Sequence, residues 1–183
     1  MDVTMLINKT HPLPERFRPD GLIDLSSVEN RRFFLPPRRI LMEASAAQAL
    51  NRMCAAAEQE AGLTEYQVVS AWRSHEEQAA IYEQRSCEGY VALPGCSEHE
   101  AGLALDFLVD GPEQSQRHLD WMGENSWKYG FIQRYPAGRE HITGICFEPW
   151  HFRYVGEELS ALLYENKWTL EEYWDRSIHP TDS

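Results

Sequence analysis

The sequence predicts an α+β fold: a single domain with a mostly antiparallel β-sheet flanked by helices. Three observations lead to this prediction. Short runs of β-branched and aromatic residues recur along the chain, and segments with helical spacing lie between and after them. Hydrophobic residues make up 43% of the sequence and charged residues 25%, as in ordinary globular proteins. A chain of 183 residues is long enough to bury a sizeable core within one domain.

The chain opens with a segment that has no regular pattern. Residues 1–40 hold five of the ten prolines, and we predict an N-terminal arm of the same domain there, extended at residues 5–8 and otherwise irregular. The body of the domain is then residues 41–183. Its clearest helix is predicted at residues 41–61, because alanine and leucine recur at helical spacing and Gly62 follows as a natural helix stop.

The rest of the body alternates between strands and helices. Ser74 and Glu77 fit a capping box that opens a helix, and Thr169 with Glu172 fits a second one in the tail. We expect the acidic residues of the tail to form a solvated face. Further predicted elements are strands at residues 67–72, 103–109, 131–135, 142–147 and 151–155, a helix that ends before Gly130, and a helix at residues 157–166.

The net charge of −12 argues against some classes of partner. Nucleic-acid binding is driven by Lys and Arg that neutralise phosphates, so we expect no nucleic acid and no anionic membrane as partner. No apolar run is long enough to span a membrane and no secretory signal is visible, which together predict a cytoplasmic protein. The four cysteines form no CxxC pair, and reduced thiols are expected, with a Cys87–Cys96 disulfide as the alternative.

Two short segments carry the residues on which function depends. The first reads SEHEAGLALD at residues 97–106, and the second, later in the chain, reads EPWH. His99, Asp106 and His151 make a plausible ligand set, since a catalytic zinc keeps three protein ligands and an open position. Glu148 lies three residues before the last ligand, where a carboxylate can take a proton from water.

The seven-residue spacing between His99 and Asp106 requires a bend. Seven residues span about 10 Å as helix and about 23 Å as strand, so neither form brings both side chains onto one ion. Gly102 is the expected bend, because glycine adopts backbone angles that other residues avoid. Asp106 then lies in a largely buried strand that carries it inward, where a carboxylate needs a partner such as a metal. We expect that metal at one edge of the sheet. Pro149 disfavours helix at the residue before it, which predicts a turn in the EPWH segment.

The same segments resemble a known family. The pattern SxHxxGxAxD followed by ExWH is similar to the zinc D,D-peptidases of the VanY and VanX type. The longer runs VALPGCSEH and TGICFEPWHFRYVG look most like the VanXY branch, and the similarity extends from Leu6 to Tyr173. This resemblance implies a hedgehog/D,D-peptidase-like fold, a Zn²⁺ cofactor and a small peptide substrate ending in D-Ala. It also implies hydrolysis of the terminal D-Ala of D-Ala-D-Ala and of peptidoglycan precursors, with a link to glycopeptide resistance.

The resemblance assigns further residues around the metal set. Arg73 would hold the carbonyl oxygen of the scissile bond or the substrate carboxylate, whereas without the resemblance it reads as half of a surface ion pair. Gln78 would contact the substrate. Ser97 would offer a hydroxyl to the substrate, although a serine at this place can also cap a turn. Trp150 would shape the pocket.

Three alternatives stay open. An L,D-carboxypeptidase acting on tetrapeptide stems would share the zinc motif and differ in its pocket walls. Two histidines and a carboxylate also form the facial triad of non-haem iron oxygenases, although there His and Asp usually lie two residues apart. A non-catalytic zinc-containing binding domain is the third. The presence of Glu148 and Arg73 argues against it, because a structural zinc site needs neither.

Glu98 and Glu100, which flank His99, are expected to be exposed. The sequence predicts no oligomeric state.

Overall fold

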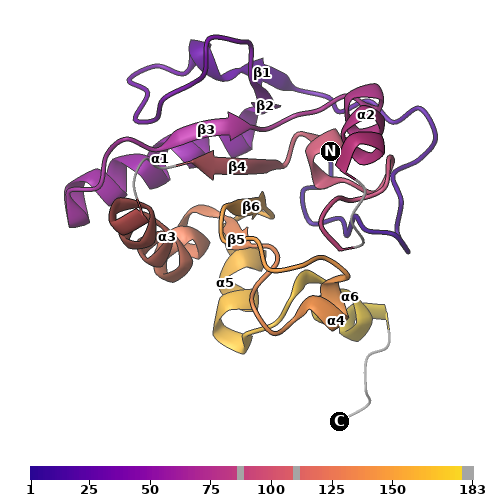
Figure 1. The fold of residues 1–183 in the computed structure, drawn as a ribbon. Coiled ribbons are helices and arrows are strands. Elements are labelled where there is room, and N and C mark those ends of the chain that lie inside the picture. Colours follow the sequence, from indigo (N-terminus) through magenta and orange to yellow (C-terminus); the bar gives the residue numbers. More distant parts are fainter. Residues whose placement is uncertain (86–88, 109–111, 179–183) are drawn as a thin grey trace.

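A four-stranded antiparallel sheet lies at the centre of the fold (Figure 1). The computed structural model describes residues 1–85, 89–108 and 112–178. The strands lie in the order β3 (Gln67–Ser70), β4 (Ala104–Leu108), β6 (His151–Tyr154) and β5 (Phe131–Gln133). Each neighbouring pair is antiparallel. The predicted α+β class and its antiparallel sheet are therefore confirmed.

A second, two-stranded sheet joins the N-terminal arm to the body of the domain. β1 (Leu22–Asp24) pairs antiparallel with β2 (Leu41–Glu43), so the arm is less irregular than its prolines suggested. The arm also contributes to the main hydrophobic core, through Ile7, Leu25, Phe33 and Ile40. The arm therefore packs against the same core as the body, while a boundary at residue 40 stays a prediction.

The helix predicted from residue 41 begins three residues later. α1 spans Ala44–Ala61, and the residues before it belong to β2. The side chain of Glu43 accepts a hydrogen bond from the backbone N–H of Ala46 at 2.9 Å, which caps the helix and ends the strand at this residue. At its C-terminal end Gly62 adopts the left-handed conformation, as the sequence predicted.

The other helices flank the sheet (Figure 1). α2 (His75–Arg85) lies at the opposite end of the strands from α3 (Pro112–Asn125), and α5 (Glu157–Asn166) packs against β5. The 3-10 helix η3 (Ser126–Tyr129) contacts α1, α3 and α5 and so ties them together. The last helix, α6 (Leu170–Ile178), contacts the short α4 (Glu140–Thr143).

Both predicted capping boxes are present. In the first, the N–H of Glu77 donates to the Ser74 hydroxyl at 3.1 Å, and the N–H of Ser74 donates to the Glu77 carboxylate at 2.8 Å. In the second, Thr169 and Glu172 exchange the same pair of hydrogen bonds at 3.2 and 2.8 Å. These boxes set the starts of α2 and α6.

The prediction of a strand at residues 142–147 is wrong. This stretch holds the end of α4 and an irregular segment that leads to Glu148. Gly144, in the left-handed conformation, ends the helix and donates its N–H to the carbonyl of Glu140 at 2.8 Å. The Thr143 hydroxyl then bonds to the backbone of Ile145. The N–H of Cys146 bonds to the carbonyl of Gly89 at 2.6 Å. Because these bonds occupy the backbone here, the segment does not extend along a neighbouring strand.

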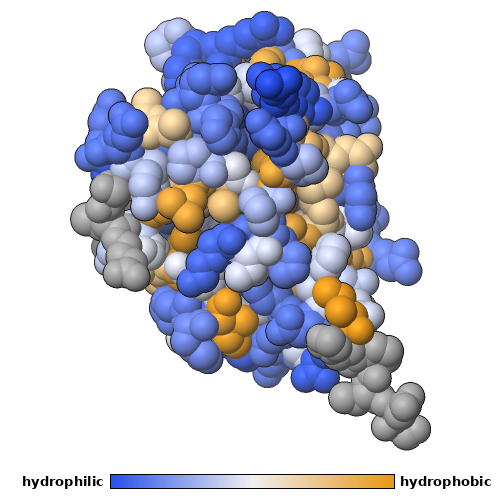
Figure 2. Space-filling model, turned by 90° about the vertical axis from the view of Figure 1, so that its right-hand side faces the viewer, coloured by the Kyte–Doolittle hydropathy of each residue, from blue (hydrophilic) through white to orange (hydrophobic). Residues whose placement is uncertain are grey.

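The surface shown in Figure 2 is largely hydrophilic, with hydrophobic side chains in small separate patches. This face carries α2 and the loops beside it, on the right-hand side of Figure 1. Among the described residues, no helix has both the length and the apolar character needed to cross a bilayer.

Candidate metal centre and active site

The two central strands and one short helix bring the three predicted ligands together. Asp106 on β4 lies directly opposite His151, the first residue of β6, in the antiparallel register, so both side chains share one face of the sheet. His99 comes from the 3-10 helix η2 (Glu98–Ala101). Gly102 ends this helix with φ of 71°, which provides the predicted bend. The site lies on the middle strands of the sheet, so its predicted place at an edge is wrong.

The distances between these side chains fit a bound metal ion. His99 Nε2 lies 3.4 Å from Asp106 Oδ2, and His151 Nδ1 lies 3.2 Å from Asp106 Oδ1. One ligand atom from each residue lies within 4.8 Å of the others. Tetrahedral zinc, with bonds of about 2.0–2.1 Å, places its ligand atoms roughly 3.3 Å apart.

Two of these atoms are buried and have no hydrogen-bond partner. They are His99 Nε2 and Asp106 Oδ1, and they face other potential ligands without forming hydrogen bonds to them. Leaving buried polar atoms unpaired is costly, and an ion between them would remove the cost. The residues present therefore fit a zinc ion in both donor type and spacing.

The backbone fixes which nitrogen of His99 is available. Its Nδ1 lies 2.6 Å from the carbonyl oxygen of Ala71, which can only accept, so Nδ1 carries the hydrogen. Nε2 is then the free lone pair, and it faces Asp106. Burial lowers the pKa of His99 to about 4, so the ring is neutral at physiological pH, as a metal ligand must be.

His151 presents its other nitrogen. Its Nδ1 faces Asp106 and lies 3.7 Å from a Glu148 oxygen, while its Nε2 lies 3.4 Å from Glu98 Oε2. Burial alone would lower the pKa of His151, but the carboxylates of Asp106 and Glu98 outweigh it and raise the pKa to about 9. The surroundings of this ring therefore favour positive charge, whether a proton or a metal ion provides it.

The expectation that Glu98 and Glu100 are exposed is wrong. Glu98 is 1% exposed and Glu100 6% exposed. Glu98 Oε1 accepts from Arg134 at 2.7 Å and from Arg153 at 2.9 Å. These arginines follow it by 36 and 55 residues, so no local pattern could have indicated the pairing. Burial alone would raise the pKa of Glu98, but the two guanidinium groups hold it well below its usual range.

Glu100 has a different task from Glu98. It accepts from the backbone N–H of Gly95 at 2.8 Å and pairs with His75 at 2.9 Å, so it fixes the loop before η2. The expected solvated face of the tail is also only partly correct, because Glu171 is buried. Its carboxylate forms two hydrogen bonds with Arg134, at 2.9 and 2.6 Å.

Glu148 reaches the metal centre from the predicted turn. The N–H of His151 bonds to the carbonyl of Glu148 at 3.3 Å, and the N–H of Glu148 bonds to the carbonyl of Tyr135 at 3.1 Å. Burial raises the pKa of Glu148 to about 7, with His151 opposing the rise and Asp106 adding to it. A carboxylate with a pKa near neutrality can both take up and release a proton.

Arg73 and Gln78 lie on the other side of the site. Arg73 Nη2 lies 3.8 Å from Asp106 Oδ2, and Nη1 donates to the Gln78 side-chain oxygen at 3.0 Å. The Gln78 amide donates to the carbonyl of Ala92 at 2.8 Å. Each polar end of Gln78 therefore has a partner within the protein, and the glutamine orients the arginine. One amide hydrogen and one oxygen lone pair remain, so the contact of Gln78 with the substrate stays a prediction.

A cavity of about 210 Å³ opens onto these groups. The three predicted ligands, the predicted base Glu148 and the four residues that the resemblance assigned all line this cavity. Ser97 is buried in its wall, and Trp150 is 43% exposed. Ser97 makes no capping hydrogen bond to η2. Nothing in the sequence pointed to Tyr135, whose ring lies 4.8 Å from that of His151. The residues lining the cavity are Arg73, Gln78, Ile81, Arg85, Tyr90, Val91, Ala92, Ser97, His99, Asp106, Tyr135, Ile145, Glu148, Trp150 and His151.

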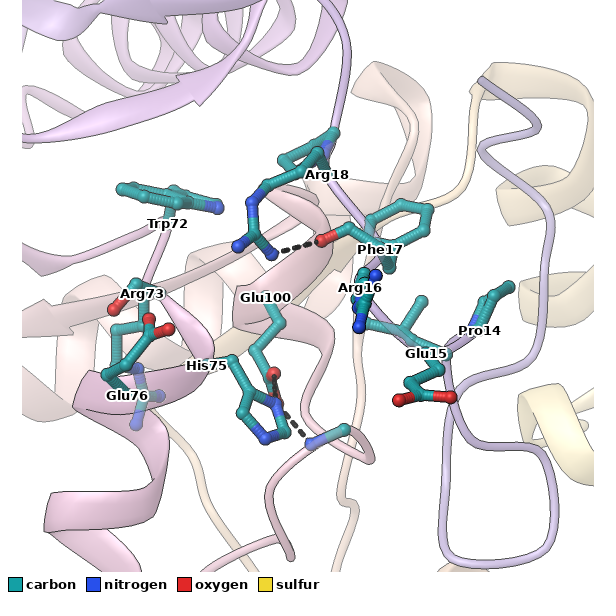
Figure 3. Close-up of a pocket in the computed structure, with 14 residues that line it drawn as sticks. Pro14, Glu15, Arg16, Phe17, Arg18, Trp72, Arg73, His75, Glu76 and Glu100 are labelled. Carbon is teal, nitrogen blue, oxygen red and sulfur yellow. Dashed lines mark hydrogen bonds and ion pairs between the residues drawn. The ribbon is translucent and has the colours of Figure 1, made fainter.

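A second cavity, of about 400 Å³, adjoins the site through Arg73 (Figure 3). Arg16, Phe17 and Arg18 of the N-terminal arm form one wall, and Trp72 and His75 face them. None of the three proposed metal ligands lines this cavity. It separates the arm from the start of α2 and does not reach the metal centre.

The alternative pairing of Cys87 with Cys96 lies outside the described residues, because Cys87 is not among them.

Comparisons with known proteins agree with this geometry. A family model described as VanY, D-alanyl-D-alanine carboxypeptidase, matches residues 39–157, more than half of the chain. VanXYC of Enterococcus gallinarum, a bifunctional D-Ala-D-Ala dipeptidase and D-Ala-D-Ala carboxypeptidase, is 35% identical over 96% of this chain and 95% of that protein.

Two solved structures share the fold. One is a variant of the vancomycin-resistance D,D-pentapeptidase VanY, from a VanB-type cassette, in complex with Zn(II). It has a TM-score of 0.80 at 30% identity and covers 95% of this chain and 99% of its own. The other is the LD-carboxypeptidase LdcB, with a TM-score of 0.80 at 35% identity, covering 93% and 84%. By its motifs, its fold and these matches, the chain belongs to the VanY family of D-alanyl-D-alanine carboxypeptidases.

Proposed function

We propose that the chain is a zinc-dependent D,D-carboxypeptidase and D,D-dipeptidase, which removes the terminal D-Ala from D-Ala-D-Ala and from peptidoglycan precursors. One observation carries the proposal: the unpaired buried atoms of His99 and Asp106 converge with His151 in a cavity that also holds Glu148. We assign these three residues as the zinc ligands. Zinc, when bound, supplies a Lewis acid that polarises a carbonyl and makes water easier to deprotonate.

The protein's own groups account for the proton transfers. Glu148 takes the proton from the attacking water, whose oxygen bonds to the carbonyl carbon of the scissile peptide. The C–N bond then breaks, and Glu148 returns the proton to the departing amine. Free D-Ala leaves with this proton on its amine, and the shortened peptide keeps a new carboxyl group, which releases the second proton of the water to solvent and becomes a carboxylate. The raised pKa of Glu148, about 7, supports both halves of this cycle.

The remaining groups of the cavity orient the substrate. Arg73 carries a positive charge close to Asp106 and Glu148, where it can stabilise the oxyanion that develops on the carbonyl or hold the terminal carboxylate. Gln78 holds Arg73 in position. We assign Ser97 and Trp150 to substrate contact, Ser97 from the wall of the cavity and Trp150 from its mouth.

An L,D-carboxypeptidase is the second candidate. The LdcB structure has the same TM-score to this chain as the VanY structure, 0.80, and its sequence identity is higher, 35% against 30%. Incubating the purified protein separately with D-Ala-D-Ala, a pentapeptide ending in D-Ala-D-Ala and a tetrapeptide ending in L-residue-D-Ala distinguishes the two. We expect D-Ala release from the first two substrates. Release from the tetrapeptide alone would assign the chain to the L,D group.

We propose a cytoplasmic location and, with it, soluble precursors as substrates and a part in glycopeptide resistance. The three cysteines among the described residues, Cys54, Cys96 and Cys146, form no disulfide with one another, which is usual in reducing compartments. Cell fractionation followed by immunodetection tests the location. Recovery of the protein only outside the cytoplasm would contradict it.

A further inference from the structure

A buried cluster of charges lies directly behind His151, on the side away from the cavity. Glu98 Oε2 contacts His151 Nε2 at 3.4 Å, while Glu98 Oε1 accepts from both Arg134 and Arg153. The side chains of Glu98, Arg134 and Arg153 are fully buried. One carboxylate therefore contacts both arginines and a proposed metal ligand.

The arginines are held from their far sides. The guanidinium of Arg134 also bonds twice to Glu171 of α6. That of Arg153 donates to the carbonyl oxygens of Val3 and Met5 in the N-terminal arm, each at 2.9 Å. The N-terminal arm and α6 therefore hold the cluster in place. The carboxylates of Glu98 and Glu171 balance the charges of the two arginines. The cluster is therefore neutral without a positive charge on His151.

This arrangement fixes the orientation of one ring. His151 Nδ1 can face Asp106 only while Nε2 faces the opposite way, where Glu98 lies. If Nε2 carries the hydrogen and donates it to Glu98, then Nδ1 is left as the free lone pair toward the metal. Carboxylates that accept from the second nitrogen of a ligand histidine orient the ring and strengthen its bond to the metal.

We propose that Glu98 is the positioning residue for His151, and that Arg134 and Arg153 hold Glu98 where it sets the tautomer and angle of this ligand. The inference rests on the proposed assignment of His151 as a zinc ligand. It also explains the sequence order of this segment. Glu98 and His99 are adjacent, so η2 supplies one ligand and the support of another.

Zinc affinity, measured without any peptide substrate, tests this role. The variants are Glu98→Gln, which keeps the shape of the side chain and removes its charge, and Glu98→Gln/Arg153→Gln, which removes one buried charge of each sign. The second variant is included because the first leaves two arginines facing a single carboxylate, which can impair folding. Competition with a chelator of known affinity gives the zinc dissociation constant of each.

Glu100→Gln is the matched control. Glu100 is a buried carboxylate on the same 3-10 helix, but it contacts Gly95 and His75 instead of a proposed ligand. We expect the zinc dissociation constant to rise about 10–100-fold in both Glu98 variants and to stay within about threefold of wild type in the control. The visible spectrum of the cobalt-substituted protein should also change only in the Glu98 variants.

Two results would overturn the inference while leaving the proposed function in place. One is wild-type zinc affinity in either Glu98 variant. The other is an equal loss of affinity in Glu100→Gln, because the effect would then come from general destabilisation of η2. A wild-type chain that binds no zinc would instead overturn the proposed function, and this inference with it.

Discussion

Glu148 lies where the proposed reaction needs a base, and its side chain is not one of the proposed ligands. Its nearer oxygen is 3.7 Å from His151 Nδ1, and burial raises its pKa to about 7. Replacing it with glutamine, Glu148→Gln, removes the proton acceptor and keeps the size of the side chain. We expect zinc stoichiometry to stay at the wild-type value and turnover to fall by about 10²–10⁴-fold. Near-normal turnover in a zinc-loaded variant would rule out this base.

Replacing His99 with alanine tests the proposed zinc ligands directly. Its Nε2 is buried and unpaired, so His99→Ala removes a ligand for which no other described side chain substitutes at that point. We expect the purified variant to hold little zinc by elemental analysis and to show no hydrolysis. His75→Ala is the control, since this half-exposed histidine pairs with Glu100 outside the metal set. Full zinc content in His99→Ala would remove this residue from the site.

The sequence predicted the ligands and Glu148 because their signals are local. Each lies in a short motif, and Gly102 and Pro149 mark the turns that bring the motifs together. Glu98 carries no such signal: a glutamate between polar residues reads as exposed, and its partners are 36 and 55 residues away. The one available hint was Arg153, an arginine inside a strand of aromatic residues, where a buried charge needs a partner.

Among the elements, the junction of η2 and β4 is the one that positions the metal centre. Gly102 has φ of 71°, and a Cβ at this position would lie 2.6 Å from Leu22 Cδ2 and 3.5 Å from the backbone nitrogen of Glu43. We expect Gly102→Ala to lower the free energy of unfolding by about 1–3 kcal/mol, because L-residues are strained in this conformation. Zinc affinity should fall as well, since His99 lies on the displaced turn. Urea unfolding and chelator competition measure the two effects.

Gly123 provides the matched control for that substitution. It is an exposed residue in α3 with no positive φ, and a methyl group on its Cα would meet no atom within 4 Å apart from its chain neighbours and the backbone of its own helix. Gly123→Ala should raise the free energy of unfolding by about 0.5–1 kcal/mol, because alanine favours helix. Zinc affinity should not change. Equal stability of the two variants would show that the backbone at Gly102 is not constrained.

Helix ends that are set by neighbouring residues in sequence could be predicted. Strands that depend on a partner strand from another part of the chain could not. The capping boxes of α2 and α6 and the stop at Gly62 depend on neighbours in sequence. The strand β2 depends on β1, which lies in the arm, so residues 41–43 read as the start of a helix. Residues 142–147 read as a strand from their composition, but no neighbouring strand of the described chain pairs with them.

At the scale of the whole molecule, the N-terminal arm and the last described helix, α6, meet behind the metal centre. The Trp174 indole donates to the carbonyl of Thr4 at 3.1 Å, and the Asn8 amide donates to Glu171 at 3.1 Å. With Arg153 bonded to the arm, these contacts link the arm, α6 and the central sheet. Such contacts between distant segments could not be predicted from the spacing of residues in sequence.

The hydrophobic core does not depend on the metal. Its main cluster runs from the arm through α1 to the central sheet, and a second cluster joins the arm, the end of β6, α5 and α6. We therefore expect the protein to stay folded after zinc is removed with a chelator, with an unchanged far-UV circular dichroism spectrum. This differs from small zinc-dependent domains, which unfold without their metal.

Zinc should nevertheless stabilise the folded state, because it binds a site that exists only there. At a free zinc concentration of about 100 times the dissociation constant, the gain is about 2.7 kcal/mol, which shifts the melting temperature of a chain of this size by roughly 5–10 °C. Thermal unfolding of the chelated protein, before and after zinc is restored, measures the shift, and His99→Ala should show none. Unfolding of the chelated protein at about 25 °C would mean that the metal is structural. An equal shift in His99→Ala would mean that zinc stabilises the chain from another site.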